Sequence, residues 1–90
     1  MVPRPTSGKH ARIYDAIYAD PVRSSIVWAD IVSLFSHLGC KVTQGEGSRV
    51  RVSYGQHRGL FHRPHPEKET DKGAVKSVRR FLDQFVSANP

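Results

Sequence analysis

The chain has 90 residues, a length that suits one small domain with a modest hydrophobic core. Its formal net charge is +6, and the basic excess lies between residues 41 and 80, which contain ten lysines and arginines but only four acidic residues. This concentration of charge indicates a polyanionic partner such as RNA, with an acidic protein partner or a merely solvated basic surface as alternatives. The single cysteine, Cys40, excludes an internal disulfide and a thiolate metal cluster, and it fits a reducing, cytoplasmic setting.

No long apolar segment is present, so we expect neither a transmembrane helix nor a signal peptide, and no contact with a membrane. Residues 1–9 contain two prolines and a glycine without an apolar run, and we expect them to form a flexible leader. Residues 10–90 are expected to form a single domain.

Two helices are predicted in the first half of the chain. Apolar residues four positions apart within 10–19 predict the first helix, which ends before Pro21 because the residue preceding a proline avoids helical geometry. Apolar residues at helical spacing from Trp28 to Leu38 predict the second helix, and Gly39 is its C-terminal stop. We predict that Trp28 anchors the core rather than stacking on a nucleic-acid base.

The hydrophobic period then changes to two, which predicts short strands at residues 40–43, 48–54 and 58–63. In the middle strand valines alternate with arginines, the pattern of one buried and one solvated face. For the third strand we place Phe61 inward, because the opposite choice would bury Arg58 and His62 at a high free-energy cost. The solvated face then collects five residues: Lys41, Arg49, Arg51, Arg58 and His62.

Pro64 and Pro66 end the third strand, because proline cannot donate to a strand ladder. A last helix follows, with Thr70 or Asp71 as its N-cap. Its apolar stripe consists of Val75, Val78, Leu82 and Phe85. The predicted order is therefore helix, helix, three antiparallel strands and helix, an α+β fold in which the helices cover one face of the sheet.

Histidines and arginines near the third strand are candidate catalytic residues. Cleavage of RNA without a metal needs a base for the 2′-hydroxyl proton, an acid for the leaving oxygen and cations for the charge on the phosphorane. Imidazole exchanges protons near neutral pH, and guanidinium binds phosphate through two parallel hydrogen bonds. The residues with these properties are His62, His65, Arg49 and Arg63. The alternative is that the histidines are surface residues without a chemical role.

We expect no metal ion or other cofactor. His62 and His65 offer two imidazoles, but Pro64 between them prevents a helical pair, and a structural zinc site needs four ligands. The remaining histidines are predicted to be surface or helix-packing residues: His10, His37 and His57.

A series of short motifs resembles the HicA family of toxins from bacterial type II toxin–antitoxin systems. The likeness runs from Ile31 to about Phe85 and rests on the following motifs: Leu38-Gly39, Gly47-Ser48-Arg49, Pro64-His65, Lys68-Glu69 and Lys72-Gly73. The resemblance implies a fold like that of double-stranded-RNA-binding domains and an mRNA interferase, a ribonuclease that cleaves mRNA and inhibits translation. It also implies neutralisation by a HicB-like antitoxin protein. The longer N-terminal region, which includes Trp28, then looks like a variant of the family with an added leading helix.

Together, the basic face and the resemblance predict His65, His62 and Arg49 as catalytic residues. The predicted RNA-binding residues are Lys41, Ser48, Arg51, Arg58, Arg63, Lys68, Lys72 and Lys76. One position departs from the family pattern, because the usual catalytic histidine after Gly-Ser is Arg49 here.

Arginine stays protonated and cannot act as a general base. His62 or His65 then supplies the proton transfer while Arg49 stabilises the phosphorane, or the protein binds RNA without cutting it, or Arg49 is an inactivating substitution. We favour the first of these hypotheses.

Overall fold

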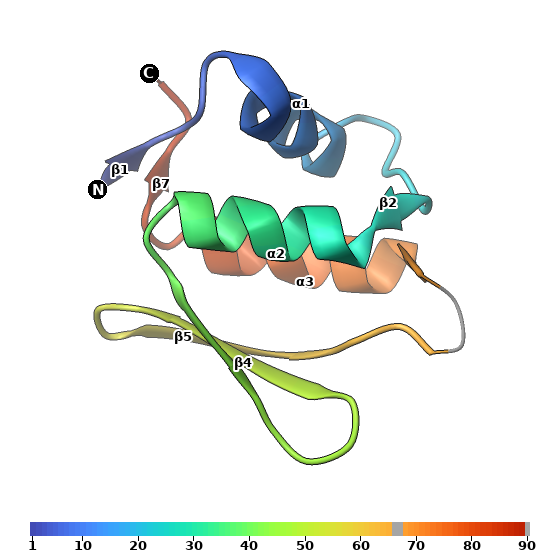
Figure 1. Ribbon diagram of the computed structural model, residues 1–90. Helices are drawn as coiled ribbons and strands as arrows, with labels where there is room; N and C mark the ends of the chain where they lie inside the picture. The colour runs from blue at the N-terminus through green and yellow to red at the C-terminus, as the bar shows by residue number, and fades with distance from the viewer. Residues whose placement is uncertain (66–67, 90) are drawn as a thin grey trace.

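The computed structural model describes residues 1–65 and 68–89, and within them it has three helices and a three-stranded antiparallel sheet (Figure 1). The helices are α1 (Gly8–Ile17), α2 (Trp28–His37) and α3 (Lys72–Leu82). The sheet has the order β3 (Lys41–Gln44), β4 (Arg49–Tyr54) and β5 (His57–His62). Two pairs of very short strands lie outside it: β1 (Val2–Pro3) with β7 (Val86–Ser87), and β2 (Ile26–Val27) with β6 (Glu69–Thr70). The predicted α+β fold is confirmed.

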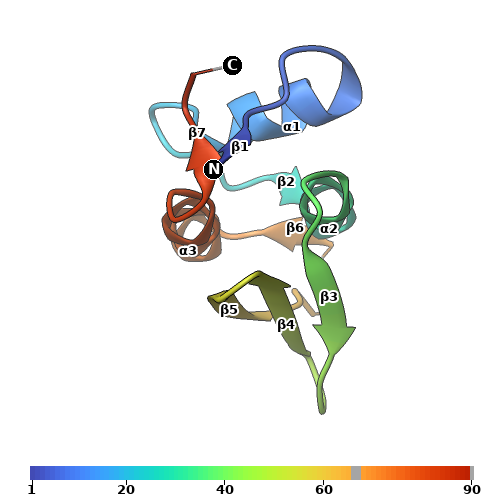
Figure 2. The same cartoon turned by 90° about the vertical axis from the view of Figure 1, so that its left-hand side faces the viewer.

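The elements form three layers (Figure 2), with the sheet below α2 and α3, and α1 above these two helices. Helix α2 contacts β3 and α3 contacts β5, while α1 packs on both helices. Between the sheet and the helices lie three phenylalanine rings, Phe35, Phe61 and Phe81, whose centroids are 5.6 to 5.9 Å apart. Trp28 is buried beside Phe35 and Phe61, so its prediction as a core anchor is confirmed. The other face of the sheet stays exposed.

Local sequence signals set the ends of the helices. Gly39 has a φ of 92°, in the left-handed region that glycine favours, and it follows α2 where the stop was predicted. Asp71 is the N-cap of α3, because its Oδ1 accepts a hydrogen bond from the Ala74 amide at 2.7 Å. The strand β5 ends at His62, in agreement with the break expected at Pro64; Pro66, the second residue of that prediction, lies outside the described residues.

The predicted direction of the side chains in the third strand is confirmed. Phe61 is 6% exposed and faces the core, whereas Leu60 is 56% exposed. The register of β4 and β5 places three pairs on the outer face: Arg49 with His62, Arg51 with Leu60, and Ser53 with Arg58. Because residues opposite one another in a sheet point to the same face, the basic side chains gather on the exposed face.

The first residues of the chain differ from the expected flexible leader. Strand β1 pairs in parallel with β7, and the Val2 amide donates a hydrogen bond to the Phe85 carbonyl at 2.7 Å. The Arg4 Nε donates to the Ala88 carbonyl, also at 2.7 Å. Local sequence patterns do not reveal this pairing, because the partner strand lies at the other end of the chain. Of the helices in residues 1–65 and 68–89, none combines the length and apolarity that a membrane crossing needs.

Candidate functional site

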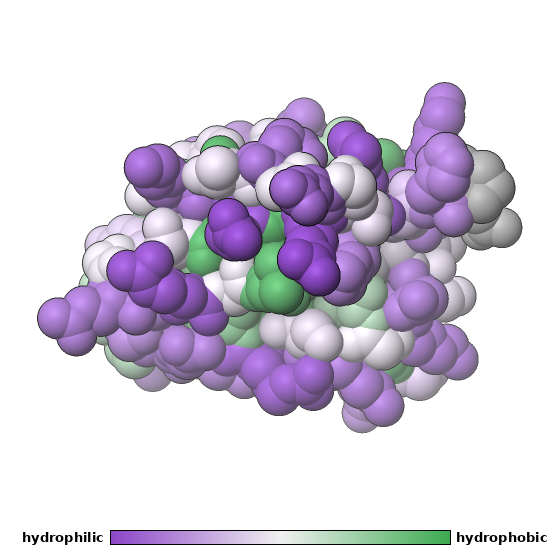
Figure 3. Space-filling model, turned by 90° about the horizontal axis from the view of Figure 1, so that it is seen from below, coloured by the Kyte–Doolittle hydropathy of each residue, from purple (hydrophilic) through white to green (hydrophobic). Residues whose placement is uncertain are grey.

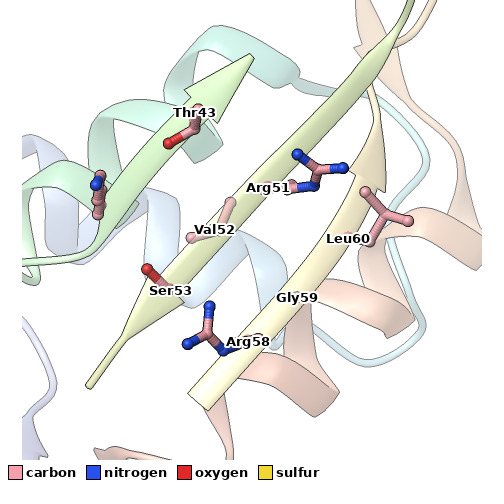
Figure 4. Close-up of a pocket in the computed structure, with 8 residues that line it drawn as sticks. Thr43, Arg51, Val52, Ser53, Arg58, Gly59 and Leu60 are labelled. Carbon is pink, nitrogen blue, oxygen red and sulfur yellow. The ribbon is translucent and has the colours of Figure 1, made fainter. Parts of the chain in front are cut away.

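A groove of about 510 Å³ runs over the exposed face of the sheet (Figure 4). The residues that line this sheet groove are Lys41, Thr43, Arg51, Val52, Ser53, Arg58, Gly59 and Leu60. In Figure 4 Arg51 and Arg58 extend from neighbouring strands on either side of Val52 and Gly59. Three of the described lining residues are cations and none is a carboxylate, so the groove favours an anionic ligand.

The sheet face combines charge with a small apolar surface. Viewed from below, hydrophilic side chains surround a small hydrophobic patch (Figure 3). Leu60 is an exposed large hydrophobic residue, and its register partner is Arg51. A ligand on this face therefore meets apolar surface between positive charges, which suits a molecule with both phosphates and bases.

Predicted catalytic residues meet at the end of the sheet where β4 begins. Arg49 lies directly opposite His62, and such cross-strand neighbours have Cβ atoms about 4.5–5.5 Å apart. The Ser48 Oγ lies 3.4 Å from the His62 Nδ1. Arg63 holds this corner together, because its backbone amide donates to the Ser48 carbonyl at 2.8 Å and its guanidinium donates to the Gly47 carbonyl at 3.2 Å.

A second hollow, of about 330 Å³, lies between the end of β5 and the start of α3. His62 and His65 both line it, so the fold brings together the two histidines that were predicted to act in proton transfer. We call it the histidine hollow. Its lining also includes two carboxylate residues, Glu69 and Asp71, although one oxygen of Asp71 is engaged by the Ala74 amide.

Three predicted RNA-binding lysines lie elsewhere. Lys72 and Lys76 are exposed on α3, one turn apart. Lys68 is exposed just before β6, where its carbonyl accepts a hydrogen bond from the Trp28 amide at 3.0 Å. None of these three lysines is among the described residues that line the sheet groove or the histidine hollow.

The remaining histidines and Cys40 pack against neighbouring side chains. The His10 ring stacks on His37 with centroids 4.2 Å apart, and its Nε2 lies 2.9 Å from the Ser33 Oγ. Partial burial, followed by the nearby His37 and Lys9, lowers the pKa of His10. Burial raises the pKa of Cys40 to about 11, which suppresses the thiolate that a nucleophile requires.

His57 lies 3.3 Å from Gln84 through its Nδ1 and stacks on Phe85, so it also has a packing role. Within residues 1–65 and 68–89, no group of three or more His, Cys, Asp or Glu side chains is placed to hold a metal ion.

Sequence reasoning missed two hydroxyl residues of the sheet groove, Thr43 and Ser53. Thr43 pairs with Arg51, and Ser53 pairs with both Lys41 and Arg58. The strand register would have identified them, because it shows which small polar residues stand beside the cations.

The sequence model of a family described as HicA toxin of bacterial toxin-antitoxin matches residues 28–84. The chain belongs to the HicA toxin family. The matched residues include α2, the whole sheet and α3, while α1 lies before them as an added N-terminal helix of this HicA toxin. The family implies a cognate antitoxin as a partner. No curated protein and no solved structure matches the chain.

Proposed function

We propose that this HicA-family protein is the toxin of a HicBA-type system and an endoribonuclease that cleaves mRNA in the cytoplasm, thereby blocking translation. The observation that carries the proposal is the position of His62. Arg49 follows Gly47 and Ser48, where the family usually has its catalytic histidine, and the sheet register puts the His62 imidazole directly across from it. An imidazole is therefore present at nearly the same place on the sheet, one strand away.

His62 and His65 divide the two proton transfers. One imidazole accepts the proton of the RNA 2′-hydroxyl while the 2′-oxygen attacks phosphorus. The other donates a proton to the 5′-oxygen as its bond to phosphorus breaks, which leaves a 2′,3′-cyclic phosphate and a 5′-hydroxyl. Arg49 stabilises the negative charge of the phosphorane. The shared histidine hollow supports this division, because both imidazoles border one space that a phosphodiester can enter.

The sheet groove holds the neighbouring part of the RNA. Lys41, Arg51 and Arg58 bind phosphates, and the exposed Leu60 supports a base between them. Ser48 and Arg63, which lie beside His62, contact the RNA near the position of cleavage. The exposed Lys68, Lys72 and Lys76 contact it outside the sheet groove and the histidine hollow. A HicB-like antitoxin silences the toxin most directly by covering this face, so we expect His62 and His65 to be protected in a footprint of the complex.

Binding of RNA without cleavage is the second candidate function, and Arg49 is the observation that favours it. A guanidinium holds a phosphate tightly but cannot accept a proton. In that case RNA affinity falls steeply with salt, because each neutralised phosphate releases counterions, and the RNA is recovered intact.

Cleavage of a mixed RNA substrate in the presence of EDTA tests the proposal. We expect the wild-type protein to cut the RNA. His62→Ala and His65→Ala should each cut about 10²–10⁴-fold more slowly while still binding RNA. His57→Ala is the matched control, since it removes an imidazole from the other end of β5 and should cut at the wild-type rate.

Intact RNA with the wild-type protein, together with salt-dependent binding, would establish the non-catalytic function. Wild-type rates for both His62→Ala and His65→Ala would show that the catalytic residues are assigned wrongly. Arg49→His restores the usual residue of the family, and we expect it to raise the cleavage rate.

A further inference from the structure

A third hollow, of about 370 Å³, lies between α1, the segment before β2 and the start of α2. Three cations line it, Lys9, Arg12 and Arg23, together with one carboxylate, Asp30. We call it the helix hollow. All three cations precede residues 28–84, so the hollow is largely built by the part of the chain that the family match does not include.

The cations of the helix hollow are available to a ligand. Lys9, Arg12 and Arg23 are exposed. In residues 1–65 and 68–89 the basic side chains that donate hydrogen bonds to the protein belong to other positions, namely Arg4, Arg63, Arg79 and Arg80. Lys9 and Arg12 are three residues apart on α1 and so project from the same side of the helix.

Asp30 reduces the positive charge of the helix hollow without cancelling it. Its carboxylate is half-buried in the first turn of α2, where the helix dipole favours a negative charge. The exposed cations therefore outnumber it three to one around the open space. A ligand with more than one negative charge, spread over several groups, fits this lining.

The helix hollow and the histidine hollow lie on the two sides of one strand pair. Strand β2 lines the helix hollow through Ile26 and Val27, and β6 lines the histidine hollow through Glu69 and Thr70. These residues pair directly, Ile26 with Thr70 and Val27 with Glu69, and paired strands are about 4.8 Å apart. Figure 2 shows this pair between α1 above and the sheet below. A linear polymer bound in the histidine hollow therefore needs to cross only the two strands β2 and β6 to reach the cations of the helix hollow.

We propose that the helix hollow binds backbone phosphates of the same RNA strand, several nucleotides away from the position of cleavage. This inference rests on the proposed function for its ligand and adds a second contact to it. Lys9, Arg12 and Arg23 bind the phosphates, and Val27, an exposed apolar residue at the crossing, lies beneath the intervening nucleotide. The added helix then serves substrate binding by selecting RNA that extends beyond the sheet.

Binding of RNAs of two lengths tests the inference. Labelled RNAs of about 4 and about 16 nucleotides are titrated by fluorescence anisotropy at several salt concentrations, in a His62→Ala/His65→Ala background that prevents cleavage. We expect Arg12→Ala/Arg23→Ala to weaken binding of the long RNA about tenfold. The slope of log affinity against log salt should become shallower by about 1.4, since each lost phosphate contact on a single strand contributes about 0.7. Affinity for the short RNA should not change.

Three further variants separate charge from other effects. Arg12→Lys/Arg23→Lys keeps both charges and should bind the long RNA within about threefold of the starting protein. Asp30→Asn removes the carboxylate and should tighten binding of the long RNA. Arg80→Ala removes an exposed charge elsewhere and should leave both affinities as they are.

An unchanged affinity and an unchanged salt slope for the long RNA in Arg12→Ala/Arg23→Ala would overturn the inference. Cleavage of the short RNA by the chain with its histidines intact tests the proposed function by itself. Length-dependent binding without any cleavage would therefore refute the ribonuclease while supporting the helix hollow. Cleavage of the RNA, together with unchanged binding of the long RNA by Arg12→Ala/Arg23→Ala, would support the ribonuclease and overturn the inference about the helix hollow.

Discussion

Arg79 links the added helix α1 to α3, and a substitution of Arg79 tests how much this link stabilises the protein. From α3 its Nε donates a hydrogen bond to the Ile17 carbonyl and its Nη2 donates to the Ala19 carbonyl, both at 2.5 Å. Its guanidinium also lies 5.7 Å from the centroid of the Tyr18 ring. The last carbonyls of a helix have no partner within the helix, so Arg79 satisfies the Ile17 carbonyl at the end of α1 and also the Ala19 carbonyl just beyond it.

The size of the effect follows from these three contacts. A hydrogen bond that involves a charged group contributes about 1.5–3 kcal/mol, and a partly exposed cation–π contact contributes about 0.5–1 kcal/mol. The three contributions do not simply add, because all of them come from one side chain and water can form hydrogen bonds to the two carbonyls once Arg79 is removed. We therefore expect Arg79→Ala to lower the free energy of unfolding by about 2–3 kcal/mol, which lowers the melting temperature of a domain of this size by roughly 10–20 °C.

Urea denaturation followed by circular dichroism measures this change, and the next residue along the chain offers the control. Arg80 is exposed, and its guanidinium bonds to the Ser77 Oγ on the same helix. Arg80→Ala should therefore change stability by less than about 0.5 kcal/mol. Arg79→Lys keeps the charge but cannot reproduce both planar hydrogen bonds, so it should recover less than half of the loss. Equal stabilities of the two alanine variants would refute the reasoning.

Two further predictions concern stability. A Cβ at Gly59 would lie 2.8 Å from the Phe61 ring and 3.0 Å from the Phe81 ring, so Gly59→Ala should lower the free energy of unfolding by about 1–3 kcal/mol. Gly73→Ala, whose Cβ would make an ordinary 3.5 Å contact, should not lower it, and a similar loss at both positions in urea titrations would contradict this explanation. The lowered pKa of His10 means that the unfolded chain binds protons more readily, so stability should fall as the pH falls below about 6.5. His10→Gln should reduce this loss between pH 7.5 and pH 5, and identical pH profiles would show that His10 makes no contribution.

Local patterns were sufficient for the main elements of this HicA toxin. The helical spacing from Trp28 to Leu38, the stop at Gly39 and the cap at Asp71 each depend on a few neighbouring residues, and all three are present in the structure. The inward direction of Phe61 was also predictable, since burying the opposite set of side chains would have buried charges. The short pairs β1–β7 and β2–β6 were not predictable, because their partners are far apart in sequence and two residues are too few to show a period.

For the candidate site, the sequence by itself determined the residue types: imidazoles and guanidiniums on one face of a sheet, and an arginine where the resemblance to HicA toxins implies a histidine. Only the tertiary structure decided which of them meet. The register sets Arg49 opposite His62, and His62 and His65 line the same hollow. The β2–β6 pair lies between this hollow and the cations of the helix hollow. The physical reason is that the period of a strand or helix specifies the face on which a side chain lies, whereas strand pairing and helix packing between distant segments specify its neighbours.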